Sequence, residues 1–328
     1  MSRSLLQIQI DTDLNCRKVE DARERGVDTS IWNDIWTSLM TDKKWLGHID
    51  DRLYHLLPGI SSSNLRTFDK RGRYAYAYEK REPDFRKEKK CFEFGKTIHS
   101  VLLEDAKLVC DEGFIDELFN PKTGEGYSSP RTTKAYKLWK FNQEEVGGKV
   151  MSGLEYSVAH RWVDQCAHHP ELTPLFKHPN ATKEQAIFAI CPKTGLLIKC
   201  KPDLFIREQK VMADVKTLSR WGGEWSTKVE KLGYHIQMPH YLYCAEQYYT
   251  EKISAFPFIC FEKEPPFEVS MKVICKEHLE VGEKILHSSL AGLAKAYEEN
   301  KWGDGINTNV EISEPSPWFM GKHYGGGA

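Results

Sequence analysis

Two aspartates and a lysine lie within a short stretch of sequence, in a pattern that could bind a metal ion. Residues 199–218 read KCKPDLFIREQKVMADVKTL, in which Asp203 follows Pro202, Asp214 comes eleven residues later and Lys216 lies two further on. Because side chains alternate between the two faces of a strand, Asp214 and Lys216 share one face. Leaving both charges on a central strand is costly unless they are paired or bind something. A structural salt bridge is the alternative to a binding role.

A third carboxylate could join this group. The turn REQK folds Asp203 back toward Asp214, and Glu184 stands at the entrance to the preceding strand. Three carboxylates repel one another unless a cation neutralises them, and hard oxygen ligands without thiolates favour Mg²⁺, for which Mn²⁺ can substitute. Lys216 could then orient or deprotonate a water molecule, or stabilise a pentavalent phosphate as a point charge. A divalent metal beside a lysine indicates hydrolysis of a phosphodiester.

The elements that must position these residues follow from the spacing of the apolar positions. Period-two runs separated by turn residues predict three successive strands and, after a helix, two further strands around a Pro-Pro turn. This order predicts an α/β fold, with a central mixed sheet of about five strands flanked by helices. The predicted strands are residues 184–191, 196–206, 211–218, 253–262 and 267–275; the predicted helices include 94–102, one after residue 151 that stops near Pro170, 226–249 and 276–300.

Composition places the chain among ordinary globular proteins. Its 328 residues carry a formal net charge of −1, which neither indicates a nucleic-acid partner nor excludes one. The nine cysteines include no C-x-x-C pair, so neither a disulfide framework nor a structural zinc or iron–sulfur site is expected. No apolar run reaches the roughly 18 residues of a membrane span, and the N-terminus does not read as a signal peptide. These features favour a cytoplasmic protein with no membrane partner.

Four segments together resemble the PD-(D/E)xK nuclease superfamily. The P-D…D-x-K pattern described above matches its signature. FGKTIHSVLLE (residues 94–104) resembles the G-x-x-x-H helix of its RecE-type and RecB-like branch, and GYHIQMPHY (233–241) resembles the Q-x-x-x-Y motif of that branch. PGISSSNL and the region before the strands resemble exodeoxyribonuclease VIII-like proteins, which are related to lambda exonuclease. The resemblance covers about residues 56–300 and implies a restriction-endonuclease-like PD-(D/E)xK core.

The resemblance implies a role for each residue of the signature. Asp203 and Asp214 would be metal ligands, with the carbonyl of Val215 as a further ligand. Lys216 would be the catalytic lysine, and His99 would bind the metal or position a water molecule.

Residues outside the signature have implied roles as well. Glu184 matches a carboxylate found before the sheet and would take part in catalysis. Gln237 and Tyr241 would contact the DNA backbone or steady the lysine. Ser61 and Ser63 match a phosphate-contacting segment, and serines in this position also offer N-cap oxygens to a helix that starts after the preceding Pro-Gly breaker.

One residue departs from the pattern of the family. Pro239 lies between Gln237 and Tyr241, where the motif requires continuous helix, so we expect the helix to kink or to restart there. Taken alone, His99 on an amphipathic helix and Tyr241 among apolar neighbours would also fit ordinary core packing.

The resemblance implies a Mg²⁺-dependent exodeoxyribonuclease. It would degrade one strand of linear double-stranded DNA processively from 5′ to 3′ and leave 3′ single-stranded tails for recombination. The expected partners are duplex DNA ends, further copies of the chain in a homo-oligomeric ring, and a single-strand annealing protein of the RecT type. The expected setting is the bacterial cytoplasm, in a phage or prophage recombination system.

Two other functions stay open on the sequence. One is a repair nuclease of the same superfamily that acts on single strands or flaps, although the chain has neither a P-loop of helicases nor a C-terminal cysteine trio. The other is a non-catalytic DNA-binding or assembly protein that keeps the fold. The intact signature disfavours this last function, because an unused and costly site is expected to drift.

The expected domain organisation has three parts. Residues 1–50 read as an accessory N-terminal extension, residues 51–312 as the nuclease domain and residues 313–328 as a C-terminal tail. Within the domain, residues 80–90 contain six basic and three acidic residues. That segment reads as a solvated loop or, alternatively, as a phosphate-contacting patch.

Overall fold

A bent antiparallel hairpin carries Asp203 and Glu184. The computed structural model describes residues 4–83, 90–104, 106–219 and 224–303. One side of the hairpin is formed by β4 and β5, and the other by β6 and β7. The bounds of these strands are Thr182–Lys183 for β4, Gln185–Ile190 for β5, Leu197–Cys200 for β6 and Leu204–Ile206 for β7.

The hairpin divides its strands between two sheets. Strands β4 and β7, the outer half of the hairpin, join a five-stranded sheet of order β10-β9-β8-β7-β4. In this sheet β8 and β9 run parallel, and the other neighbouring strands run antiparallel. Strands β5 and β6, the inner half of the hairpin, join a three-stranded sheet of order β1-β5-β6. The remaining strands of the two sheets are β1 (Lys44–His48), β8 (Val211–Leu218), β9 (Phe258–Glu262) and β10 (Val269–Lys272).

Helices cover both faces of the five-stranded sheet. One face packs on α5 (Ser62–Arg81) together with the C-terminal helices, and the other packs on three helices that lie between α5 and the hairpin in sequence, with separate buried clusters on each side. The first group comprises α5, α11 (Trp225–Leu232), α12 (Tyr234–Tyr249) and α13 (Lys276–Glu299); the second comprises α6 (Lys90–Leu103), α9 (Gly153–His168) and α10 (Leu172–Phe176). The predicted α/β class with a five-stranded mixed sheet between helices is confirmed.

The N-terminal segment packs on the three-stranded sheet. A third buried cluster joins its helices to β5 and β6, and β1 pairs with β5. Gln9 fixes the contact, because its side chain exchanges two hydrogen bonds with the backbone of Leu197, at 2.7 and 3.1 Å. The helices are α1 (Leu5–Leu14), α2 (Arg17–Glu24), α3 (Ile31–Asp42) and α4 (Asp51–Leu56).

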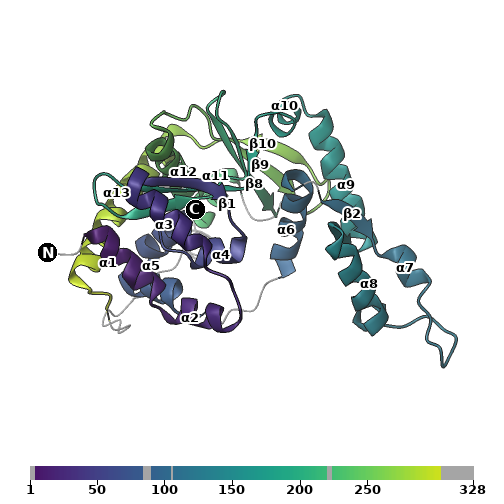
Figure 1. Ribbon diagram of the computed structural model, residues 1–328. Helices are drawn as coiled ribbons and strands as arrows, with labels where there is room; N and C mark the ends of the chain where they lie inside the picture. Colours follow the sequence, from purple (N-terminus) through teal and green to yellow (C-terminus); the bar gives the residue numbers. More distant parts are fainter. Residues whose placement is uncertain (1–3, 84–89, 105, 220–223, 304–328) are drawn as a thin grey trace, which may run out of the picture.

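A small projecting unit lies between α6 and α9, and we call it the arm (residues 107–151). Figure 1 shows its helices reaching away from the two sheets. Its base is a parallel pair of short strands beside α6, the helix that carries His99. The arm consists of β2 (Lys107–Cys110), α7 (Glu112–Asp116), η1 (Pro130–Thr132), α8 (Lys134–Glu145) and β3 (Gly148–Met151).

Two predicted elements are interrupted in the structure. The strand predicted over residues 196–206 is split between β6 and β7, because Pro202 has no N–H for the ladder and the two halves pair within different sheets. The helix predicted over 226–249 is split at Gly233, which has a positive φ of 76° and separates α11 from α12.

Pro239 does not interrupt α12. The helix runs from Tyr234 through Pro239 to Tyr249, so it does not restart at the proline. The proline leaves the carbonyl of His235 without its helical donor. The backbone of Gly282 in α13 lies against that carbonyl, so closely that a Cβ on Gly282 would stand 1.7 Å from the oxygen.

No helix among the described residues has the length and apolarity required to cross a membrane. The predicted tail, residues 313–328, and residues 84–89 of the predicted basic segment lie outside the described part of the chain. Lys80, at the start of that segment, is buried and donates to the carbonyls of Leu57 and Gly59, so its ammonium is not available to a phosphate.

Candidate metal centre and active site

The carboxylates of Glu184, Asp203 and Asp214 lie in one row across three strands. Lys183 pairs with Leu204, so the next step of the same register places Glu184 opposite Asp203. The N–H of Glu184 donates to the carbonyl of Asp203 at 3.2 Å, which confirms this placement. Leu204 in turn pairs with Ala213 of β8, so Asp203 also stands opposite Asp214. Directly opposed residues present their side chains on the same face of a sheet.

Asp203 occupies the fork where β8 separates from the hairpin. Beyond this point β8 pairs with β9, while the hairpin continues into the other sheet. The freed N–H of Val215 donates to Oδ2 of Asp203 at 2.5 Å, so the carboxylate takes the place of a ladder acceptor. The N–H groups of Met212 and Asp214 donate toward the β9 side. Because a strand residue directs its N–H and C=O to the same side, the carbonyl of Val215 faces the Asp203 side.

His99 completes a group of possible metal ligands from the opposite direction. Its Nδ1 lies 3.3 Å from Oε1 of Glu184 and 3.6 Å from Oδ1 of Asp203. The ligand atoms of these three residues all lie within 4.8 Å of one another. Ile98, the neighbour of His99 on α6, is buried in the core and thereby fixes the helix face that presents the imidazole. One imidazole nitrogen and two carboxylate oxygens suit a divalent cation such as Mn²⁺ or Mg²⁺.

Glu184 reaches this group through an uncommon backbone conformation. Its φ is +54°, in the left-handed region that few residues other than glycine adopt. The residue stands between β4 and β5, where the hairpin passes from one sheet to the other. A strained backbone at the junction of two sheets is typical of a position whose side chain has a function.

Asp214 belongs to the same row, but its carboxylate is held by other partners. Oδ1 accepts a hydrogen bond from Nε2 of Gln237 at 2.7 Å, and Oδ2 forms an ion pair with Lys216. The ammonium of Lys216 also lies 5.2 Å from the centre of the Tyr234 ring. Tyr241 lies near enough to Asp214 and Gln237 to interact with both, so α12 supplies three side chains to this half of the site.

The pKa values show how strongly these groups interact. Burial raises the pKa of Asp203 to about 7, and repulsion from Asp214 acts in the same direction against the attraction of His99. Burial opposes the charge of His99, but Asp203 and Glu184 outweigh it and raise the pKa of the imidazole to about 9. Burial also opposes the charge of Glu184, but His99 and Lys201 lower its pKa to about 2. The acidic row therefore favours a positive charge at its centre.

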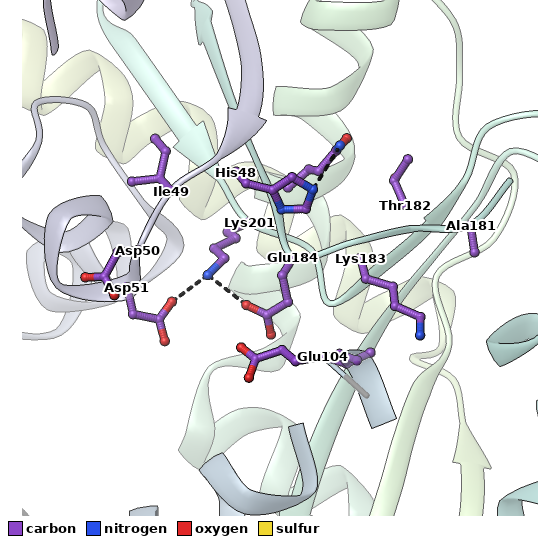
Figure 2. A pocket seen from close by; sticks show the side chains of 12 residues that line it. His48, Ile49, Asp50, Asp51, Glu104, Ala181, Thr182, Lys183, Glu184 and Lys201 are labelled. Carbon is purple, nitrogen blue, oxygen red and sulfur yellow. Dashed lines mark hydrogen bonds and ion pairs between the residues drawn. The ribbon is translucent and has the colours of Figure 1, made fainter. Parts of the chain in front are cut away.

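A cavity of about 650 Å³ opens beside Glu184 (Figure 2). Lys201 stands at its wall, with its ammonium 2.7 Å from Oε2 of Glu184 and 2.6 Å from Oδ1 of Asp51. This lysine and Tyr234 were not expected at the site from the sequence. Alternation along the strand could have indicated Lys201, which precedes Asp203 by two positions, but no local signal indicated Asp51 or Tyr234.

The hydrogen bonds of the two serines go to other residues than those of the metal site. Ser61 is the N-cap of α5 as predicted, and it forms a capping box with Asn64. Its hydroxyl is 2.9 Å from that of Ser63, and both serines line a cavity of about 440 Å³ that shares no lining residue with the cavity beside Glu184. The structure thus unites eight of the ten predicted site residues and leaves Ser61 and Ser63 outside this set of contacts.

Comparison with known proteins identifies the family of the chain. Residues 61–307 match the model of a family described as a PDDEXK-like domain of unknown function (DUF3799). None of the curated proteins matches. A crystal structure from Eubacterium rectale, described as a "Putative exonuclease", is similar at 15% identity and a TM-score of 0.48, over 81% of this chain and 93% of that one. That likeness is too distant to support an argument.

The family match spans well over half of the chain, and it includes the row of carboxylates, Lys216 and the helix of His99. The chain therefore belongs to the family of PDDEXK-like domains of unknown function (DUF3799).

Proposed function

We propose that this protein is a divalent-metal-dependent deoxyribonuclease that degrades one strand of linear duplex DNA from 5′ to 3′. The observation that supports this most strongly is the convergence of His99, Glu184 and Asp203 beside the ion pair of Asp214 with Lys216. These residues come from four separate segments of the chain, yet they meet at the fork of the sheet. Membership of a PDDEXK-like family supports the same chemistry.

The residues at the fork fit a divalent cation. His99, Glu184 and Asp203 would hold it, and Asp214 and the carbonyl of Val215 stand next to them as further ligands. A bound Mg²⁺ or Mn²⁺ would neutralise the scissile phosphate and activate a water molecule. The hydrogen bond from the N–H of Val215 fixes the Asp203 carboxylate in place, which preorganises the group before any cation binds.

Lys216 is proposed to act as a cation rather than as a base. Burial opposes its charge, but Asp214 and Asp203 outweigh burial and raise its pKa above the ordinary value of 10.5. The side chain therefore stays protonated at neutral pH and can stabilise negative charge on a phosphate in the transition state. Gln237 donates a hydrogen bond to the other oxygen of Asp214, which holds this carboxylate in position beside the ammonium of Lys216.

Further features of the activity rest on the RecE-type resemblance. We propose that cleavage is processive and leaves 3′ single-stranded tails, and that copies of the chain assemble into a ring around DNA. A RecT-type annealing protein would take up the tails in the cytoplasm of a bacterial host. Ser61 and Ser63 would contact DNA phosphates away from the row of carboxylates, and residues 1–50 would serve as an accessory extension to the nuclease domain.

The proposal is tested by incubating the purified protein with linear and covalently closed circular duplex DNA in Mg²⁺. Linear DNA should be degraded from its 5′ ends while the closed circle survives. Asp214→Ala should abolish degradation, because the variant removes the partner of Lys216 and a carboxylate of the row. Asp164→Ala is the matched control, since that aspartate is exposed on α9 and paired only with His168 among the described residues.

Each alternative result has a definite meaning. Cleavage of the closed circle would show an endonuclease, and preference for single strands or flaps would favour a repair nuclease. Absence of cleavage with both Mg²⁺ and Mn²⁺ would refute the proposed activity and favour a binding protein.

A further inference from the structure

The outer face of α8 in the arm is both apolar and basic. Leu138 and Phe141 are 62% and 57% exposed, and Lys134 and Lys137 are exposed beside them. Lys134, Leu138 and Phe141 follow one another at spacings of four and three residues, which places them along one side of the helix. Neither lysine forms an ion pair with any residue that the structure describes. The first turns of α8 therefore form a positive strip with two apolar side chains in it, and Glu144 and Glu145 follow in the last turn.

This face is held rigidly by the opposite side of the same helix. Trp139 stacks on Phe114 of α7, with ring centres 4.5 Å apart and planes inclined by 6°. Tyr136 donates its hydroxyl to the buried Asp111 at 2.7 Å, and Arg131 forms two hydrogen bonds with the same carboxylate, at 2.7 and 2.9 Å. Since Trp139 and Tyr136 turn inward, Phe141 and Leu138 must turn outward.

The arm carries seven basic and seven acidic side chains, but most of the basic ones are concentrated in its middle part. Residues 118–143 contain five basic side chains and one acidic side chain, a local net charge of +4, whereas the whole chain has a net charge of −1. The base of the arm contacts α6, which presents His99 at the metal site. The basic residues of this segment are Lys122, Arg131, Lys134, Lys137 and Lys140, and the acidic residue is Glu125.

We propose that the outer face of α8 binds single-stranded DNA. The positive strip is complementary to the phosphate backbone, while an exposed aromatic ring between lysines provides a stacking surface for an unpaired base. A duplex would use the lysines but would leave Phe141 and Leu138 without a role, because its bases are stacked on one another. The inference rests on the proposed nuclease function, since a single strand is what degradation of one strand of a duplex leaves behind.

Binding is measured without cleavage, by fluorescence anisotropy in EDTA with a labelled oligothymidylate of about 20 nucleotides, which exceeds the usual site size. Phe141→Ala should weaken single-strand binding by about fivefold or more and leave binding of a duplex of equal length unchanged. Lys134→Gln combined with Lys137→Gln should weaken both and reduce the slope of log K against log salt by about 0.7 per lysine for the single strand.

Val146→Ser is the matched control. Val146 is 80% exposed at the end of α8 but points away from the lysines, so its replacement should leave affinity unchanged. Thermal unfolding should be the same for all variants, because none of the replaced side chains is buried. Unchanged single-strand affinity in Phe141→Ala would overturn the proposal. An altered oligomeric mass with unchanged affinity would also overturn it and would make the face a contact between copies of the chain.

A small substrate separates this proposal from the proposed function. Hydrolysis of bis(4-nitrophenyl) phosphate in Mn²⁺ should proceed equally in wild type and Phe141→Ala, and it should be lost in Asp214→Ala. If neither the wild-type protein nor any variant hydrolyses this small substrate or DNA, the nuclease proposal fails. The anisotropy measurements still decide whether α8 binds single-stranded DNA.

Discussion

Lys216 has the clearest separate role among those proposed for the residues of the site. Its neighbours Asp214 and Asp203 raise its pKa, so the ammonium is retained at the pH where the proposed reaction runs. Unlike the carboxylates, a cation has no use as a metal ligand. Loss of Lys216 should therefore affect catalysis without removing the metal site.

Lys216→Met tests this separation. The variant keeps the aliphatic stem and removes the charge, so kcat should fall by about 100-fold or more, in the range found when one electrostatic contact to a transition state is lost. The affinity for Mn²⁺, measured by calorimetry, should stay the same or rise, because a competing partner of Asp214 has been removed. Lys210→Met, on the exposed turn before β8, is the control and should keep full activity. Retained activity in Lys216→Met would show that the lysine is only structural.

At the level of elements, the packing of α12 against α13 sets the position of Gln237 and Tyr241. Pro239 frees the carbonyl of His235, and Gly282 allows α13 to approach it. These two helices make one of the most extensive contacts between elements of the fold. The glycine is therefore required by the close approach of two helix backbones rather than by its conformational freedom.

Gly282→Ala should be strongly destabilising for this reason. The new methyl group would meet a backbone oxygen that cannot rotate away, so the free energy of unfolding should fall by about 1–3 kcal/mol or more. Urea denaturation measures it. Gly113→Ala, in α7, has no atom within 4 Å of the new methyl group and should change stability by no more than about 1 kcal/mol. Equal effects of the two substitutions would contradict the close helix packing.

Across the whole molecule, the sequence predicted the strands from β5 to β10, with β6 and β7 as one strand, but not β1 to β4, and the resemblance predicted most residues of the candidate site. The alternation of side chains along the predicted strand correctly placed Val215 in the core beneath α6 and α9, and Asp214 on the other face of β8. The order of the predicted elements was sufficient to give the α/β class. The cysteines contributed only exclusions, and the net charge neither indicated nor excluded a nucleic-acid partner.

Other features depend on contacts that no local pattern records. The fork at Asp203 arises because two sheets share one hairpin, which Pro202 permits but does not specify. The pairing of Lys201 with Asp51 joins residues 150 positions apart. The left-handed backbone conformation of Glu184 could not be predicted, because the position has neither glycine nor asparagine, the residues that usually indicate a positive φ. Each of these features is set by tertiary packing rather than by propensity.

The central claim is that the carboxylates at the fork hold a divalent cation beside Lys216. A crystal structure after soaking with Mn²⁺, with anomalous scattering recorded at the manganese edge, tests it most directly. We predict an anomalous peak at the fork, within about 2.0–2.6 Å of carboxylate oxygens of Asp203 and of at least one of Glu184 and Asp214. The peak should be lost in Asp203→Asn crystals. A manganese ion bound elsewhere, with the fork empty at saturating Mn²⁺, would contradict the claim.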